Sequence, residues 1–155
     1  MKLGEALAKR AELQNRLGQV RDRLRLSALV QEGDQPPEDP EPLLAELEQV
    51  AHDLERLIAA INQTNAITRL PSGATLTQAL ARRDVLGLRH SALRAVADAT
   101  AQRQARYSRS EIRLVRTFDV GEVRKLVDSL AREQRELDVE IQAANWTVEL
   151  TDDQA

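Results

Sequence analysis

The sequence contains no cysteine and only three aromatic residues, Trp146, Tyr107 and Phe118, among 155. The lack of cysteine excludes a disulfide framework, a thiolate nucleophile and a cysteine-based zinc site. The lack of aromatic residues leaves leucine, valine, isoleucine and alanine to form the core. Such a core suits narrow seams between helices better than a sandwich or a barrel, so we expect an all-α fold.

Long apolar runs and turn residues are also scarce. The longest purely apolar run is Leu57–Ile61, far short of the roughly 20 residues that span a bilayer. The first ten residues carry charges where a secretion signal needs an apolar stretch. Six glycines and five prolines are too few for a many-stranded fold. We therefore predict a cytoplasmic protein with no membrane partner.

A strong excess of one charge is missing too. The formal net charge is −3, so no basic field draws the whole protein to an anionic polymer. Nucleic acid is therefore not favoured as a partner.

The motifs of common enzymes and metal sites do not occur. A carboxylate-bridged di-metal bundle needs Glu-x-x-His on two helices, but the residues three before His52 and His90 are Gln49 and Gly87. Neither a Gly-x-Ser-x-Gly elbow nor a Gly-x-x-x-x-Gly-Lys loop is present. We predict no metal, no cofactor and no catalytic residue, and we assign neither an enzymatic activity nor a small-molecule ligand. We interpret His90 as a packing residue and His52 as solvated.

What the sequence does contain is four long amphipathic stretches, with apolar residues recurring at alternating steps of three and four. The predicted helices cover about 2–30, 40–64, 76–104 and 120–144. Three of them open on N-terminal signals: Asp39 with Pro40, Thr75 with Gln78, and Asp119 with Glu122. The second predicted helix should end near 62–65, where the side chains of asparagine, glutamine and threonine compete for backbone hydrogen bonds.

These helices predict a single domain over 1–155, an antiparallel four-helix bundle with coiled-coil-like seams. We allow one or two short strands in the connections, at 112–118 and 145–150, where apolar and polar residues alternate.

The third helix carries two apolar stripes on nearly opposite sides. One stripe runs from Leu76 to Ala97. The second consists of Ala81, Val85, Leu88, Ala92, Val96 and Ala99. A helix that is apolar on two sides is buried on two sides, so we predict that the second stripe is a subunit interface and the protein a homo-oligomer. The alternative is that this helix is the central helix of a lopsided monomer.

Polar residues interrupt the stripes at Arg10, Arg83 and Gln134. A polar residue in a helix seam sets register and partner choice, and we interpret these three in that way. A sharper interpretation is a polar pocket lined by Arg83, His90 and Asp84.

The segment 103–118 is the richest candidate for a binding site. It contains five arginines against the single acid Glu111. Its candidate anion-binding residues are Arg106, Tyr107, Arg109, Arg113 and Arg116. Arginine forks and a tyrosine suit a phosphate or a single-stranded nucleic acid. The competing interpretation is that these arginines pair with the acidic loop 32–41, which contains no basic residue.

Several short segments of the sequence occur together in a known protein family. They are Met1–Leu3, Val30–Asp34, Asn62–Asn65, Leu76–Asp84, Arg106–Ile112 and Asn145–Thr147. With these the chain resembles the septicolysin-like family of small, mostly uncharacterised bacterial helical proteins. The resemblance supplies no catalytic residues, and the family name implies cytolysis. We disfavour cytolysis because no secretion signal or membrane-inserting segment is seen. Our prediction is a homo-oligomeric helical-bundle scaffold or interaction protein, with an anion or nucleic-acid binding module as the alternative.

Overall fold

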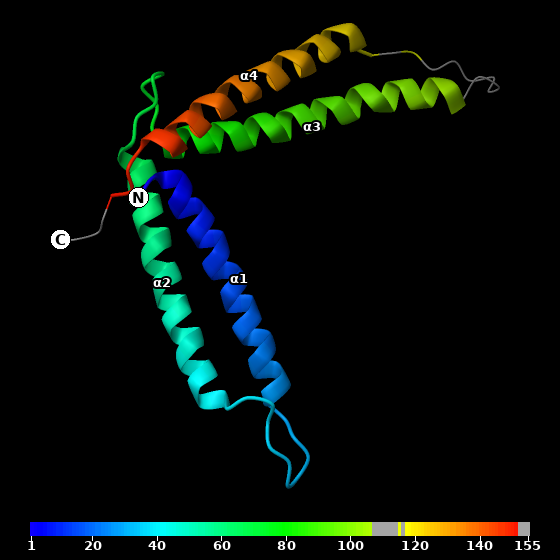
Figure 1. The fold of residues 1–155 in the computed structure, drawn as a ribbon. Coiled ribbons are helices and arrows are strands. Elements are labelled where there is room, and N and C mark those ends of the chain that lie inside the picture. The colour runs from blue at the N-terminus through cyan, green and yellow to red at the C-terminus, as the bar shows by residue number, and fades with distance from the viewer. Residues whose placement is uncertain (107–114, 116, 152–155) are drawn as a thin grey trace. The chain divides into compact units, whose positions relative to one another are not determined.

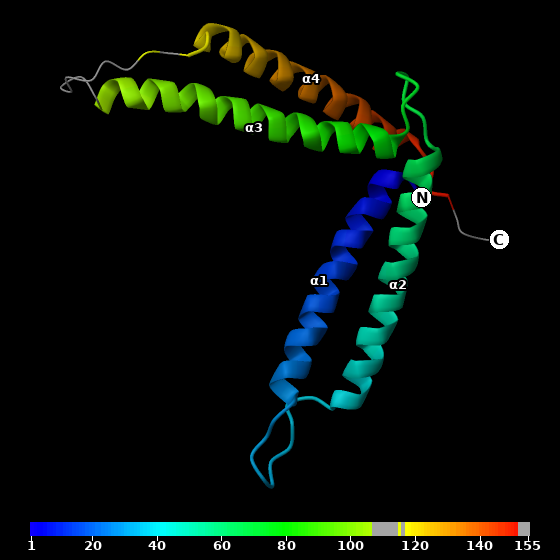
Figure 2. The same ribbon diagram turned by 180° about the vertical axis from the view of Figure 1, so that it is seen from behind.

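The computed structural model describes the backbone of residues 1–106, 115 and 117–151, and the side chains of these residues except 101–106. Four helices follow one another along the chain: α1 (Leu3–Ser27), α2 (Pro40–Ile67), α3 (Leu76–Arg106) and α4 (Val120–Thr147). Helices α1 and α2 lie side by side, and so do α3 and α4, in both views (Figures 1 and 2). The predicted all-α class with four helices is confirmed. The described part of the chain contains no strand, only isolated bridges that join Lys2 to Glu149 and Arg69 to Thr75.

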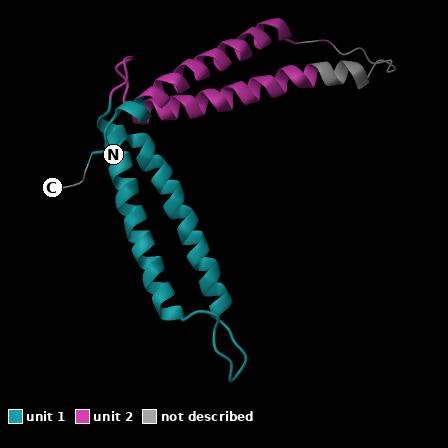
Figure 3. Cartoon of the chain, in the orientation of Figure 1, with its two compact units in different colours: residues 1–68, 144–155 teal, residues 69–143 magenta. Residues whose placement is uncertain are grey.

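The chain divides into two compact units (Figure 3). Unit 1 consists of Met1–Thr68 and Ala144–Ala155, and unit 2 of Arg69–Ala143. Unit 1 therefore holds α1, α2 and the last turn of α4. Unit 2 holds α3 and the rest of α4.

The core of unit 1 is the predicted seam between α1 and α2. Its buried apolar residues are Leu3, Ala6 and Val20 on α1, and Leu43, Val50, Ala60 and Ile61 on α2. Helix α2 begins as predicted, because the Asp39 carboxylate accepts a hydrogen bond from the backbone amide of Glu41 at 3.1 Å and Pro40 takes the first helical position.

The ends of the helices differ from the prediction. Helix α1 stops at Ser27 instead of Val30, and Leu29 beyond it is 90% exposed, so no packing partner extends the helix. Helix α2 continues to Ile67, past the predicted fading point. The reason is Thr64, whose buried hydroxyl donates to the Ala60 carbonyl at 2.7 Å inside the helix.

The C-terminal segment completes unit 1. The Thr151 amide donates to the Thr64 hydroxyl at 3.0 Å, and the Leu3 amide donates to the Val148 carbonyl at 2.9 Å. Helix α4 runs to Thr147, so the strand predicted at 145–150 is a helical turn followed by a single bridge. The Lys2 ammonium donates to the Thr147 carbonyl at 3.1 Å, which places a cation at the C-terminal end of a helix.

Gly4 allows α1 to approach this end of α4 closely. A methyl group at Gly4 would lie 3.1 Å from the Asn145 carbonyl oxygen and 3.4 Å from Cε3 of Trp146. Gly18, also on α1, has open space at the same position. The first glycine is therefore required by packing and the second is not.

The core of unit 2 is the seam between α3 and α4. Its buried apolar residues include Leu76, Ala79, Leu86 and Ala97 on α3, and Val120, Leu130 and Ile141 on α4. Thr75 and Gln78 form the predicted capping box, with reciprocal bonds of 2.9 and 3.2 Å. Asp119 caps α4 by accepting from the Gly121 amide at 2.7 Å, while the Glu122 carboxylate pairs with Lys125.

Candidate functional site

The second stripe of α3 lies on the surface of unit 2. We call it the α3 outer face: Ala81, Val85, Leu88, Ala92, Val96 and Ala99, all of which are exposed. Leu88 is 71% exposed, Val85 53% and Val96 42%. The opposite stripe of the same helix is buried in the seam with α4. Helix α3 therefore carries an exposed apolar stripe on the surface of unit 2, and both the subunit interface and the central-helix alternative stay predictions.

Of the polar seam residues, Arg83 and Gln134 lie in unit 2. The Arg83 guanidinium donates to the Asp84 carboxylate at 2.9 and 3.1 Å and lies 4.0 Å from the Asp138 carboxylate of α4. Gln134 is half-buried beside Gly87. Arg83 thus links α3 to α4 across the seam, which fits a role in helix pairing.

Arg10 is the polar seam residue of unit 1. It is half-buried, and its Nε has no hydrogen-bond partner among the described residues. Leaving a buried donor without a partner costs folding free energy. This cost argues against Arg10 being in the seam only to fill space.

His90 lines a shallow cleft of about 330 Å³ between α3 and α4. The charged residues around it are Arg94, Asp98, Arg124 and Asp128, so the predicted trio of Arg83, His90 and Asp84 does not form this cleft. Each helix contributes one arginine and one aspartate, and Arg94 lies 3.9 Å from Asp98. The two cations and two anions balance, which makes the cleft a poor trap for an anion.

A larger groove of about 630 Å³ lies in unit 1. It has Leu13, Leu57 and Ala60 in its lining, together with Lys9, His52, Asp53, Glu55 and Arg56. His52 is exposed, as predicted. The Met1 amine, Lys9 and Arg56 supply cations and Asp53 and Glu55 supply carboxylates, so charges of both signs line the groove.

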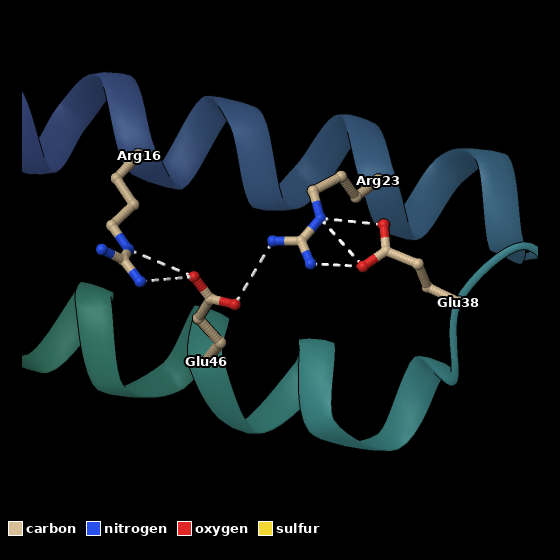
Figure 4. A network of polar contacts seen from close by, with 4 residues as sticks. All are labelled: Arg16, Arg23, Glu38 and Glu46. Atoms are coloured by element: carbon tan, nitrogen blue, oxygen red, sulfur yellow. Dashed lines mark hydrogen bonds and ion pairs between the residues drawn. The ribbon is translucent and has the colours of Figure 1, made fainter.

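The acidic loop has a partner that sequence reasoning missed. Arg23 of α1 is ion-paired with Glu38 of the loop and lies 3.4 Å from Glu46 of α2, which also pairs with Arg16 at 2.9 Å (Figure 4). The hydrogen bond from Arg23 lowers the pKa of Glu38, and the same bond raises the pKa of Arg23. The network ties the α1–α2 loop to both helices of unit 1.

The predicted anion-binding residues belong to the end of α3 and to the segment between α3 and α4. Tyr107, Arg109, Arg113 and Arg116 lie outside the described residues, and so does the side chain of Arg106. Their pairing with the acidic loop, or with an anion, stays a prediction.

In the described ranges, no three or more histidine, aspartate or glutamate side chains form a group suited to a metal ion. None of the described helices combines the length and the apolar character needed to cross a membrane.

Comparison with known proteins places the chain in a family. The model of DUF6847, a family of unknown function, matches residues 10–150, so the chain belongs to this family. The chain is also similar to a functionally unknown conserved protein from Corynebacterium diphtheriae, known from its crystal structure. The two are 46% identical with a TM-score of 0.88, over 97% of this chain and 99% of that chain. No curated protein matches the chain.

Proposed function

We propose that this member of DUF6847 is a homo-oligomeric scaffold or interaction protein whose subunits pack through the α3 outer face. The observation that carries the proposal is the exposure of this face, since all six of its apolar residues are open to solvent on one side of one helix. An apolar stripe at helical spacing is the pattern by which amphipathic helices bind one another.

Among the described residues, the other exposed apolar side chains do not recur at helical spacing along one helix. Leu26, Leu29 and Val30 lie at or just beyond the end of α1, Leu44 and Ile67 near the two ends of α2, and Leu126 and Val139 on α4. Single exposed apolar residues are common on soluble proteins, whereas contiguous ones mark interaction surfaces. The α3 outer face is therefore the part of the described surface best suited to a subunit contact.

The size of the effect can be bounded. Burying an exposed leucine or valine completely is worth about 1.5–3 kcal/mol. A symmetric contact buries Leu88 and Val85 from both subunits. Even partial burial of these four side chains is enough to contribute several kcal/mol to association, before the cost of lost rigid-body freedom.

The test is a charge placed in the stripe. Leu88→Glu should shift the protein toward smaller species in sedimentation velocity, because a carboxylate must be desolvated when the stripe is covered. Val139→Glu is the matched control, since Val139 is 70% exposed on α4 and lies off the α3 outer face. The proposal predicts that the control keeps the wild-type assembly. An identical sedimentation profile for Leu88→Glu and wild type would overturn it.

A further inference from the structure

We propose that two α3 helices from two copies of this chain pack in parallel and in register, so that Val85, Leu88 and the alanines of the α3 outer face each meet their own counterpart. This inference rests on the proposed function, because it names the partner as a second copy and gives its orientation. It comes from the charged residues that flank the stripe.

The stripe follows a coiled-coil heptad. Counting Val85 as position a makes Leu88 position d, and the a and d positions between them are Ala81, Val85, Leu88, Ala92, Ala95 and Ala99. Ala95 is exposed like the rest. The flanking positions differ in charge. The e positions are Arg82, Arg89, Val96 and Arg103, and the g positions are Thr77, Asp84, Ser91 and Asp98.

Charges at e and g decide how two such helices pair. In a parallel pair each g residue meets the e residue five positions further along the partner helix. Asp84 then faces Arg89 of the second copy, and the sequence repeats this spacing at Asp98 and Arg103. Two-fold symmetry generates each attraction twice.

An antiparallel pair reverses the sign of these contacts. There e faces e and g faces g, so Arg89 meets Arg89 near the centre of the stripe, and Asp84 meets Asp98. Like charges brought together at such positions disfavour the arrangement. The flanking charges therefore select the parallel orientation.

The groups needed for the parallel contact are accessible. The Asp84 side chain is 66% exposed, and both hydrogen bonds from Arg83 end on its Oδ1 atom, which leaves Oδ2 open within the described residues. Arg89 is exposed and has no ion pair with any other described residue. Neither side chain has to break a buried contact in order to reach the second copy.

The orientation can be tested by disulfide crosslinking, because the chain has no cysteine and any introduced thiol is therefore unique in it. Ala81→Cys and Ala99→Cys each introduce one thiol at opposite ends of the stripe, about 27 Å apart along the helix at 1.5 Å per residue. A disulfide requires Cα atoms within roughly 7 Å. In the parallel dimer each variant alone should form a covalent dimer on mild oxidation, because each cysteine lies beside its own copy. Ser129→Cys, an exposed position on α4, is the control and should stay monomeric on a non-reducing gel.

Each other outcome contradicts the inference in a distinguishable way. Covalent dimers only in a mixture of the two alanine variants would show antiparallel helices; the orientation would be wrong and the proposed function would stand. No crosslinks in a protein that sediments as a dimer would place the interface elsewhere and overturn the orientation and the α3 outer face together. Crosslinking of Ser129→Cys to the same extent would show random collision and also count against the inference. Circular dichroism of each variant establishes that it is folded.

Discussion

Two glycines on α1 make opposite predictions when each is replaced by alanine. Gly18 lies inside the helix with open space where a methyl group would stand. Alanine is favoured over glycine in a helix interior by about 0.8–1 kcal/mol. Gly18→Ala should therefore stabilise the protein by about that amount.

Gly4 behaves differently because its methyl group would lie 3.1 Å from the Asn145 carbonyl oxygen. This oxygen belongs to the backbone of α4 and cannot turn away as a flexible side chain would. Overpacking of this kind costs about 1–3 kcal/mol. The gain in helix propensity, at most about 1 kcal/mol, offsets only part of that cost. We expect Gly4→Ala to lose up to about 2 kcal/mol of stability, by the difference of these two terms.

The assay is urea unfolding followed by tryptophan fluorescence. Trp146 is the single tryptophan of the chain, and its ring lies 3.4 Å from the position of the added methyl group. The signal therefore reports on unit 1, where both glycines are found. Gly4→Ala should lower the urea midpoint and alter the emission of the folded state, and Gly18→Ala should raise the midpoint without altering the emission. A Gly4→Ala protein stabilised as much as Gly18→Ala would refute the close approach of α1 and α4.

Two further predictions concern the segment that closes unit 1. The bonds from Lys2 and from the Met1 amine lower the pKa of Glu149, so its ion pairs stabilise the fold above the unfolded pKa of about 4.3 and stop doing so as pH falls through the lower folded value. Thermal melts should show Glu149→Gln less stable than wild type at pH 7, with a gap that narrows as the pH falls below about 4.3; a gap that stays constant down to the acid limit would contradict the pairing. Thr64→Val removes the hydroxyl that accepts from the Thr151 amide, at a cost of about 1 kcal/mol. Hydrogen exchange at Thr151 should accelerate in this variant and stay slow in Thr64→Ser.

The fold could be predicted from the sequence where local pattern decides it. The seams of α1 with α2 and of α3 with α4 follow the stripes directly, and the caps at Asp39 and Thr75 are short-range signals. The helix ends could not be predicted in this way. The Thr64 hydroxyl, which donates to the Ala60 carbonyl inside the helix, also accepts from the amide of Thr151, 87 residues away. Such a contact leaves no trace in local composition.

The candidate site divides along the same line. The apolar stripe of the α3 outer face could be predicted from the sequence because its residues recur at helical spacing on one helix. The partner of Glu38 could not be predicted. Arg23 is one of many arginines, and the two residues meet only because the α1–α2 loop folds back beside α1. The requirement for glycine at position 4 could not be predicted either, because the residues that contact it, Asn145 and Trp146, lie near the other end of the sequence.

The most direct test of the account is the mass of the wild-type protein in solution. The chain mass is 17.3 kDa, and sedimentation equilibrium over a range of concentrations measures the assembled mass without a probe. Subunits that pack through the α3 outer face predict a mass that rises to at least twice the chain mass. A modest interface has a Kd in the micromolar range. A mass of 17.3 kDa at every protein concentration, up to roughly a hundred times that Kd, would contradict the account.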